Sequence, residues 1–111
     1  MNEPEPLDVR GSEPRNEAGG DERRVRLTIR GRVQGVWFRG SAQEQARRLG
    51  VVGWARNRPD GSVEIVAQGA ARALEAFVEW CGRGPTGARV DSIARDSEAA
   101  GTDLARFEIR G

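Results

Sequence analysis

Residues 31–39, GRVQGVWFR, have the types and the spacing of an anion-binding loop. Gly31 and Gly35 permit positive φ angles and close backbone approach, and successive inward N–H groups form a cradle for anions. A helix that begins just after the loop adds unpaired N–H groups and about half a positive charge at its N-terminus. Arg39 adds a permanently charged planar fork that matches two phosphate oxygens. The stretch therefore predicts a phosphate-binding site.

Several kinds of chemistry are excluded because the chain contains no His, Lys or Tyr. Imidazole bases, Schiff-base or Walker lysines and tyrosine nucleophiles are all unavailable. A single cysteine, Cys81, cannot form an internal disulfide or a Cys-based zinc site, and its place in a helical apolar pattern indicates a buried packing residue. The acidic residues after position 24 form no D-x-D or E-x-x-E pair, so we expect no metal site and no cofactor.

The composition changes near residue 25. Residues 1–24 contain seven acidic and four basic residues and three prolines, so we expect a disordered acidic tail that cannot bury enough apolar surface to fold. Residues 25–111 form the expected domain, in which fourteen arginines and ten acidic residues give a net charge of +4. That charge suits an anionic ligand without being a nucleic-acid signature. Without a signal sequence or a membrane-spanning stretch, the protein is expected to be cytoplasmic.

The loop must be positioned by a strand before it and a helix after it. Period-two alternation over residues 25–31 predicts a half-buried strand. Apolar residues three or four positions apart over residues 38–49 predict a helix that stops at Gly50. The start of this helix stays open, because Ser41 and Glu44 also form a capping-box pair that would place the N-cap at Ser41.

The remaining elements predict the fold class. We expect strands over residues 51–57 and 62–68, joined by the R-P-D-G turn of a hairpin, a helix over 70–82, and strands over 88–95 and 104–110. We further expect Trp54, Phe107 and Ile109 to face the core. The order β-α-β-β-α-β, with its last portion doubled, predicts an α+β fold. This is a ferredoxin-like split β-α-β sandwich, with two helices on one face of a four- to five-stranded antiparallel sheet.

Three segments together resemble the acylphosphatase family. They are GRVQGVWFR, the run GWARNRPDGSVE that begins at Gly53, and GPTGARVD that begins at Gly84, and the resemblance covers residues 25–111. It implies hydrolysis of the carboxyl-phosphate bond of acyl phosphates to carboxylate and inorganic phosphate, without metal or cofactor. It also implies that Arg39 binds the phosphate and that Asn57 orients the attacking water. The implied phosphate-binding loop consists of Arg32, Val33, Gln34, Gly35, Val36 and Trp37.

Other interpretations of the same residues stay open at this point. Asn57 would also serve as a turn residue that satisfies nearby amides, Arg32 as a loop brace or surface charge, and Trp37 either as a wall of the ligand entrance or as a structural wedge. Trp37 and Arg58 stand where such proteins often have smaller residues, so both would reshape the mouth of the site. The alternative function is a non-catalytic phosphate- or anion-binding or interaction module on the same fold. We expect a monomer that binds no nucleic acid and no membrane, since the aromatic run of RNA-binding sheets is absent from the sequence.

Overall fold

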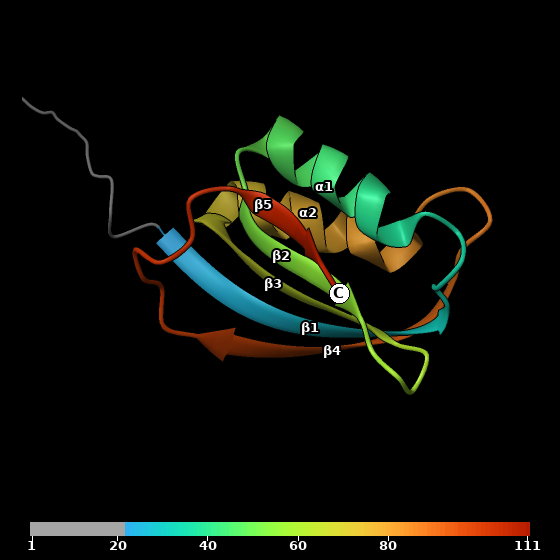
Figure 1. The fold of residues 1–111 in the computed structure, drawn as a ribbon. Helices are drawn as coiled ribbons and strands as arrows, with labels where there is room; N and C mark the ends of the chain where they lie inside the picture. The colour runs from blue at the N-terminus through green and yellow to red at the C-terminus, as the bar shows by residue number, and fades with distance from the viewer. Residues whose placement is uncertain (1–21) are drawn as a thin grey trace, which may run out of the picture.

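A computed structural model describes residues 22–111 as a sheet covered by helices (Figure 1). The elements are β1 (Glu22–Arg32), α1 (Phe38–Leu49), β2 (Val52–Asn57), β3 (Val63–Ala70), α2 (Ala71–Arg83), β4 (Arg89–Glu98) and β5 (Phe107–Arg110). Residues 1–21 of the expected tail lie outside the described residues. Residues 22–24 of that expected tail belong to β1, because they pair with the end of β3.

The strands lie side by side in the order β4-β1-β3-β2-β5. The pairs β1–β3, β1–β4 and β2–β3 are antiparallel, whereas β2 and β5 are parallel. The ferredoxin-like arrangement is therefore confirmed, but the expectation of a purely antiparallel sheet is wrong at the β5 edge. The cause is the direction of the chain. Because β4 runs opposite to β1 and β2, a strand that crosses the sheet after β4 returns parallel to β2.

Both helices pack on the same face of the sheet and enclose the core (Figure 1). Phe77 of α2 lies at its centre, with ring centroids 5.7 Å from Phe107 and 6.5 Å from Trp80. The buried apolar side chains come from every layer: Val25, Leu27, Ile29, Phe38, Ala42, Ala46, Ala55, Val63, Ile65, Ala67, Leu74, Phe77, Cys81 and Phe107. Cys81 is thus a packing residue, as the helical pattern predicted.

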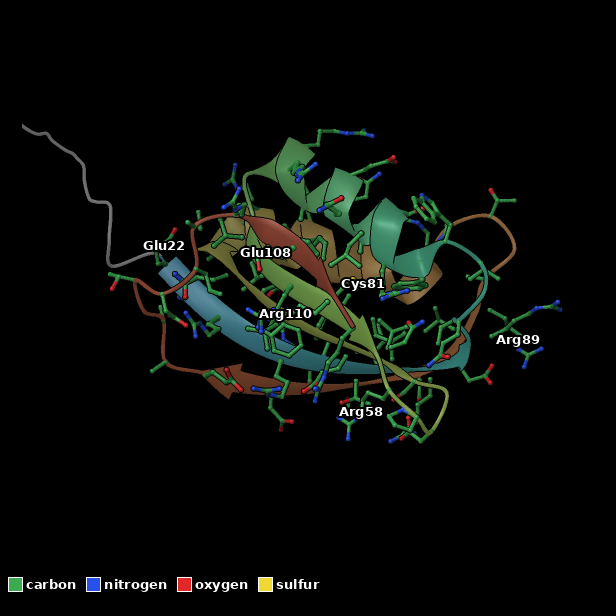
Figure 2. The ribbon with its side chains drawn as sticks, in the orientation of Figure 1. Glu22, Arg58, Cys81, Arg89, Glu108 and Arg110 are labelled. Carbon is green, nitrogen blue, oxygen red and sulfur yellow. The ribbon has the colours of Figure 1, made fainter. Side chains whose placement is uncertain are left out.

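Trp54 does not lie in this core, contrary to the expectation. Its neighbours Gly53 and Ala55 are the residues of β2 that are buried under the helices. Since successive side chains of a strand point to opposite faces, Trp54 lies on the face of the sheet that carries no helix. There the guanidinium of Arg110 lies 4.8 Å from the centre of the Trp54 ring, a cation–π distance. Arg110 is labelled at the front of the sheet in Figure 2.

The same helix-free face carries a buried carboxylate. Glu64 of β3 accepts hydrogen bonds from Arg26 of β1 and from Arg56 of β2, the latter at 2.6 Å. Burial alone raises the pKa of Glu64, but the hydrogen bonds from Arg56 and Arg26 outweigh burial and hold that pKa below its ordinary value. The carboxylate is therefore charged at neutral pH and joins three neighbouring strands.

Helix α1 begins at Phe38, directly after the glycine loop. Trp37 is its N-cap, in the left-handed conformation with φ 63° and ψ 32°, and makes no side-chain capping bond. The amide of Ser41 already donates to the carbonyl of Trp37 at 3.0 Å, so Ser41 lies inside the first turn and is not the cap. The positive end of the helix dipole therefore lies at the loop.

Candidate active site

A pocket of about 430 Å³ opens where the loop after β1, the start of α1, the end of β2 and the end of β5 meet. Its lining residues are Val33, Gln34, Gly35, Val36, Trp37, Phe38, Arg39, Gly40, Asn57 and Ile109. The structure thus brings together Arg39, Asn57 and five of the six residues expected in the phosphate-binding loop. Arg32 does not line this pocket, because it is the last residue of β1 and pairs with Arg89 of β4.

Three residues give the loop its shape. Val33 is only 1% exposed, so its side chain anchors the loop in the core. At the start of the loop, β1 bulges against β4 and Gly31 adopts a φ of 133°. A Cβ atom on Gly31 would lie 2.1 Å from the carbonyl oxygen of Arg89, so only glycine fits this close approach. Gly35 has a φ of 77° and supplies the second left-handed turn.

Gln34 connects the loop to the β2–β3 hairpin. Its side-chain Nε2 donates to the carbonyl oxygens of Arg58 at 2.8 Å and Ser62 at 2.9 Å. Because Arg58 directly follows Asn57, these two bonds fix the position of Asn57 relative to the loop. The side-chain amide of Gln34 thus holds two parts of the site together, and its backbone N–H stays in the predicted phosphate cradle.

The hairpin turn is itself rigidly held. Asp60 accepts hydrogen bonds from the amide of Ser62 at 3.0 Å and from its hydroxyl at 2.6 Å. These bonds, together with Arg30 at 3.1 Å, hold the pKa of Asp60 well below its usual range. The amide of Arg58 donates to the carbonyl of Ser62 at 2.8 Å and closes the turn. Asn57 therefore lies at the base of a turn with few alternative conformations.

The loop after α2 packs against the loop that follows β1 and against the start of α1. A Cβ on Gly84 would lie 2.8 Å from a ring carbon of Phe38, and one on Gly87 would lie 3.9 Å from a methyl group of Val36. The third segment of the sequence pattern, which begins at Gly84, therefore packs against the loop without lining the pocket. Gly84 allows the close packing on Phe38, whereas the approach of Gly87 to Val36 is an ordinary van der Waals contact.

The cradle offers donors that no protein group uses. Among the hydrogen bonds of residues 22–111, none has the backbone N–H of residues 34–38 as its donor. These five N–H groups belong to the loop and to the start of α1, where the helix dipole favours negative charge. Consecutive amides at such a place bind phosphate and similar anions.

Arg39 projects from the first turn of α1 and is held by β5. Its Nη1 donates to the backbone carbonyl oxygen of Arg110 at 2.9 Å. Within residues 22–111 no carboxylate lies within 4.0 Å of its guanidinium, so its charge is available to a ligand. Since the side chain of Arg110 lies on Trp54, the end of β5 is fixed on both sides.

Two groups at the site were not found from the sequence. Ile109 was expected in the core but is 40% exposed and lines the pocket. The reason is that Phe107 lies beneath the helices, whereas Ile109 lies one pleat further along β5, where the pocket opens. The carbonyl of Arg110 was also missed, because a backbone group gives no residue-type signal.

Within the described part of the chain, the pocket combines amides that no protein acceptor uses, the Arg39 guanidinium without a carboxylate partner and the neutral carboxamide of Asn57. Amides and guanidinium suit an anion with several oxygens, and a carboxamide both donates and accepts hydrogen bonds without adding charge. Within residues 22–111, no group of three or more His, Cys, Asp or Glu side chains comes together as a possible metal site. In the same residues, neither helix has the length and apolar character required to cross a bilayer.

Comparison with known proteins shows what this chain is similar to. The family profile described as Acylphosphatase matches residues 25–109. An acylphosphatase of Rubrobacter xylanophilus is 48% identical over 94 residues, which are 85% of this chain and 86% of that protein. An acylphosphatase of Anaeromyxobacter dehalogenans is 50% identical over 90 residues, covering 81% of this chain and 97% of that one. The solved structure of an acylphosphatase from Coxiella burnetii superposes with a TM-score of 0.81 at 31% identity, over 86% of this chain and all of that one.

Proposed function

The chain belongs to the acylphosphatase family and is a hydrolase of acyl phosphates, and on that premise we propose how its pocket performs the reaction. Water attacks the phosphorus atom, the bond from phosphorus to the bridging oxygen breaks, and the bridging oxygen leaves with the carboxylate. A non-catalytic module on the same fold is not favoured, because relatives with about half of their residues identical are acylphosphatases. The proposal concerns which residues carry each step.

The phosphoryl group binds to the backbone amides of residues 34–38 and to the guanidinium of Arg39. The phosphate is largely dianionic at neutral pH, since its second pKa is roughly 6. In the transition state its charge spreads over the three equatorial oxygens, which fixed donors stabilise without reorganising. The support for this assignment is that, within residues 22–111, these five amides have no protein acceptor and the adjacent Arg39 has no carboxylate partner.

The leaving group explains why no histidine is needed. A carboxylate is already a stable anion, so no general acid has to protonate it. The attacking water can give its proton to an oxygen of the phosphate itself. Catalysis then depends on the position of the water and on stabilised charge.

Asn57 orients the attacking water. Its carboxamide accepts a hydrogen bond from water while it remains neutral, so it does not repel the phosphate. The bonds from Gln34 to the hairpin place Asn57 at the pocket that Arg39 also lines. The single observation that carries the proposal is this convergence of Arg39, Asn57 and the unused amides on one pocket.

The experiment is phosphate release from acetyl phosphate, measured in the presence of EDTA. We expect activity in the unchanged protein, and a loss of about two to three powers of ten in kcat for Arg39→Ala. Arg47→Ala is the matched control, since Arg47 is an exposed arginine in the last turn of the same helix and should leave kcat unchanged. Decay of acetyl phosphate at its spontaneous rate, or equal activity of both variants, would refute the assignment.

We propose that the monomer is the active species, since Arg39, Asn57 and the loop amides, which are assigned to the phosphate and the water, already line one pocket. We also propose that no nucleic acid takes part, because an acyl phosphate is a small molecule. Size-exclusion chromatography at assay concentration, followed by activity measurement across the eluted peak, checks this part of the proposal.

A further inference from the structure

We propose that Trp37 and Ile109 form a subsite for the acyl group and that this subsite favours aromatic acyl phosphates over small aliphatic ones. The inference rests on the proposed function, because it names the part of the substrate that lies beyond the phosphoryl group. It assigns a role in specificity to two side chains that have no part in the reaction itself.

The first observation is where the exposed apolar side chains are. Within residues 22–111, the large hydrophobic side chains that are exposed are Trp37, at 70%, and Ile109, at 40%. Single exposed hydrophobic residues are ordinary on a protein surface. These two, however, come from distant parts of the chain and both line the pocket that contains Arg39 and Asn57. An apolar wall beside convergent polar groups is typical of a small-molecule site.

The second observation is how Trp37 is held. An indole that served only as a wedge would be buried, whereas this one is mostly exposed. Its ring lies against the first turn of α1, since a Cβ on Gly40 would be 2.2 Å from Cε2 and 2.6 Å from Nε1 of the indole. Gly40 itself is buried. The helix backbone therefore supports the ring and leaves it as a flat apolar platform at the mouth.

The third observation is the backbone conformation of Trp37. Among residues 22–111 it is the only residue other than glycine with a positive φ. This conformation is unfavourable for a bulky side chain and persists only where the surrounding structure fixes it. The Trp37 side chain makes no capping hydrogen bond that would explain this conformation. The indole is thus held at the pocket mouth by a backbone that a smaller residue would occupy more easily.

The charges around the pocket favour an uncharged acyl group. Arg39 is the only charged residue among those that line it, and the proposed function assigns its guanidinium to the phosphate. A second carboxylate or an ammonium on the acyl group would therefore find no further charged side chain among the lining residues and would gain nothing from the apolar surfaces of Trp37 and Ile109. An aromatic ring can stack on the indole and contact Ile109. The volume of about 430 Å³ lies in the range of sites for whole small molecules, which exceeds the need of phosphate alone.

The test compares kcat/KM for benzoyl phosphate and acetyl phosphate in the full chain. We expect the unchanged protein to prefer benzoyl phosphate by about tenfold or more, because a stacked ring removes much apolar surface from water. Trp37→Asn removes the indole and keeps a residue that accepts a left-handed backbone. It should lower the value for benzoyl phosphate about tenfold more than the value for acetyl phosphate. Trp37→Phe should retain most of the preference.

Gly40→Ala gives a second test that leaves Trp37 in place. The added Cβ must displace the indole, although alanine is the better helix former. We expect the preference for benzoyl phosphate to fall while the protein stays folded in a thermal melt. Equal loss for both substrates in Trp37→Asn, or an unchanged preference in both variants, would overturn the subsite and leave the proposed function standing. Failure of the unchanged protein to hydrolyse either substrate would overturn both.

Discussion

The contact between Gln34 and the hairpin should determine both stability and rate. Its Nε2 makes two hydrogen bonds to backbone carbonyls, at 2.8 and 2.9 Å. Each such bond contributes about 1 kcal/mol net, so Gln34→Ala should reduce the free energy of unfolding by about 2 kcal/mol. The same change releases the loop from Asn57. Because a displacement of about 1 Å at a reacting geometry can cost a factor of about 100, we expect kcat to fall about ten- to a hundredfold.

The two effects are measured by urea denaturation and by acetyl phosphate hydrolysis. Gln34→Glu is a sharper variant of the same size, because a carboxylate cannot donate and would face two carbonyl oxygens. Gln68→Ala is the matched control. Gln68 is a glutamine whose Nε2 likewise donates to a backbone carbonyl, that of Gly101 at 2.8 Å, but it lies at the other end of β3. Its loss should lower stability and leave kcat unchanged.

One result would refute the reasoning on Gln34. If Gln34→Ala and Gln68→Ala lost similar stability and both kept full kcat, the bonds to the hairpin would be structural only. The position of Asn57 would then not depend on them.

Three further predictions concern the rest of the molecule. Glu64→Gln should cost about 1 kcal/mol at neutral pH, since its three arginine partners, Arg26, Arg56 and Arg58, are partly exposed and screened. Hydrogen bonds outweigh burial and lower the folded pKa of Glu64, so this contribution to stability is present above the ordinary pKa of 4.5 and is lost as pH falls through the lowered pKa. The measurement is the free energy of unfolding of both proteins as a function of pH. A difference between them that stays constant down to strong acid would contradict the prediction. Burial raises the pKa of the Cys81 thiol, so a thiol reagent should modify it only in urea, and rapid reaction of the folded protein would show that the core opens. Trp54→Ala removes the aromatic contact of Arg110 and should lower kcat severalfold by loosening the carbonyl that holds Arg39, while full kcat would show that pairing with β2 fixes β5 alone.

Local patterns in the sequence were sufficient for much of the fold. The alternation before Gly31, the helical spacing after Phe38 and the turn before Ser62 each depend on residues close together in the chain. The structure contains the strand, the helix and the hairpin that these patterns predict. The ends of the elements differ from expectation by a few residues, because strand pairing extends wherever a partner strand is present.

The side of the sheet on which a residue lies was harder to predict. Trp54 and Ile109 are apolar residues in strands, and such residues are usually expected in a core. Trp54 lies on the face without helices because its small neighbours take the covered face. Ile109 is on the covered side but beyond the helices. Both outcomes depend on the arrangement of distant elements, which residue spacing within one strand does not contain.

In the candidate site, the functional residues could be predicted from the sequence, whereas the contacts that position them could not. Arg39, Asn57 and the glycine loop carry recognisable residue types, and the structure places them around one pocket. The groups that hold these residues in place carry no recognisable residue type. Gln34 acts through its bonds to backbone carbonyls, and Arg39 is held by the carbonyl of Arg110, for which any residue would serve. The parallel pairing of β5 that places this carbonyl follows from the whole topology.

The most direct test of the account is a crystal structure of the protein with bound phosphate. We expect one phosphate ion in the pocket, within hydrogen-bond distance of amides from residues 34–38 and of the Arg39 guanidinium. The carboxamide of Asn57 should lie one water molecule away from it. A phosphate bound elsewhere, loop amides that point away from the ion, or an Arg39 that makes no contact with it would contradict the central claim.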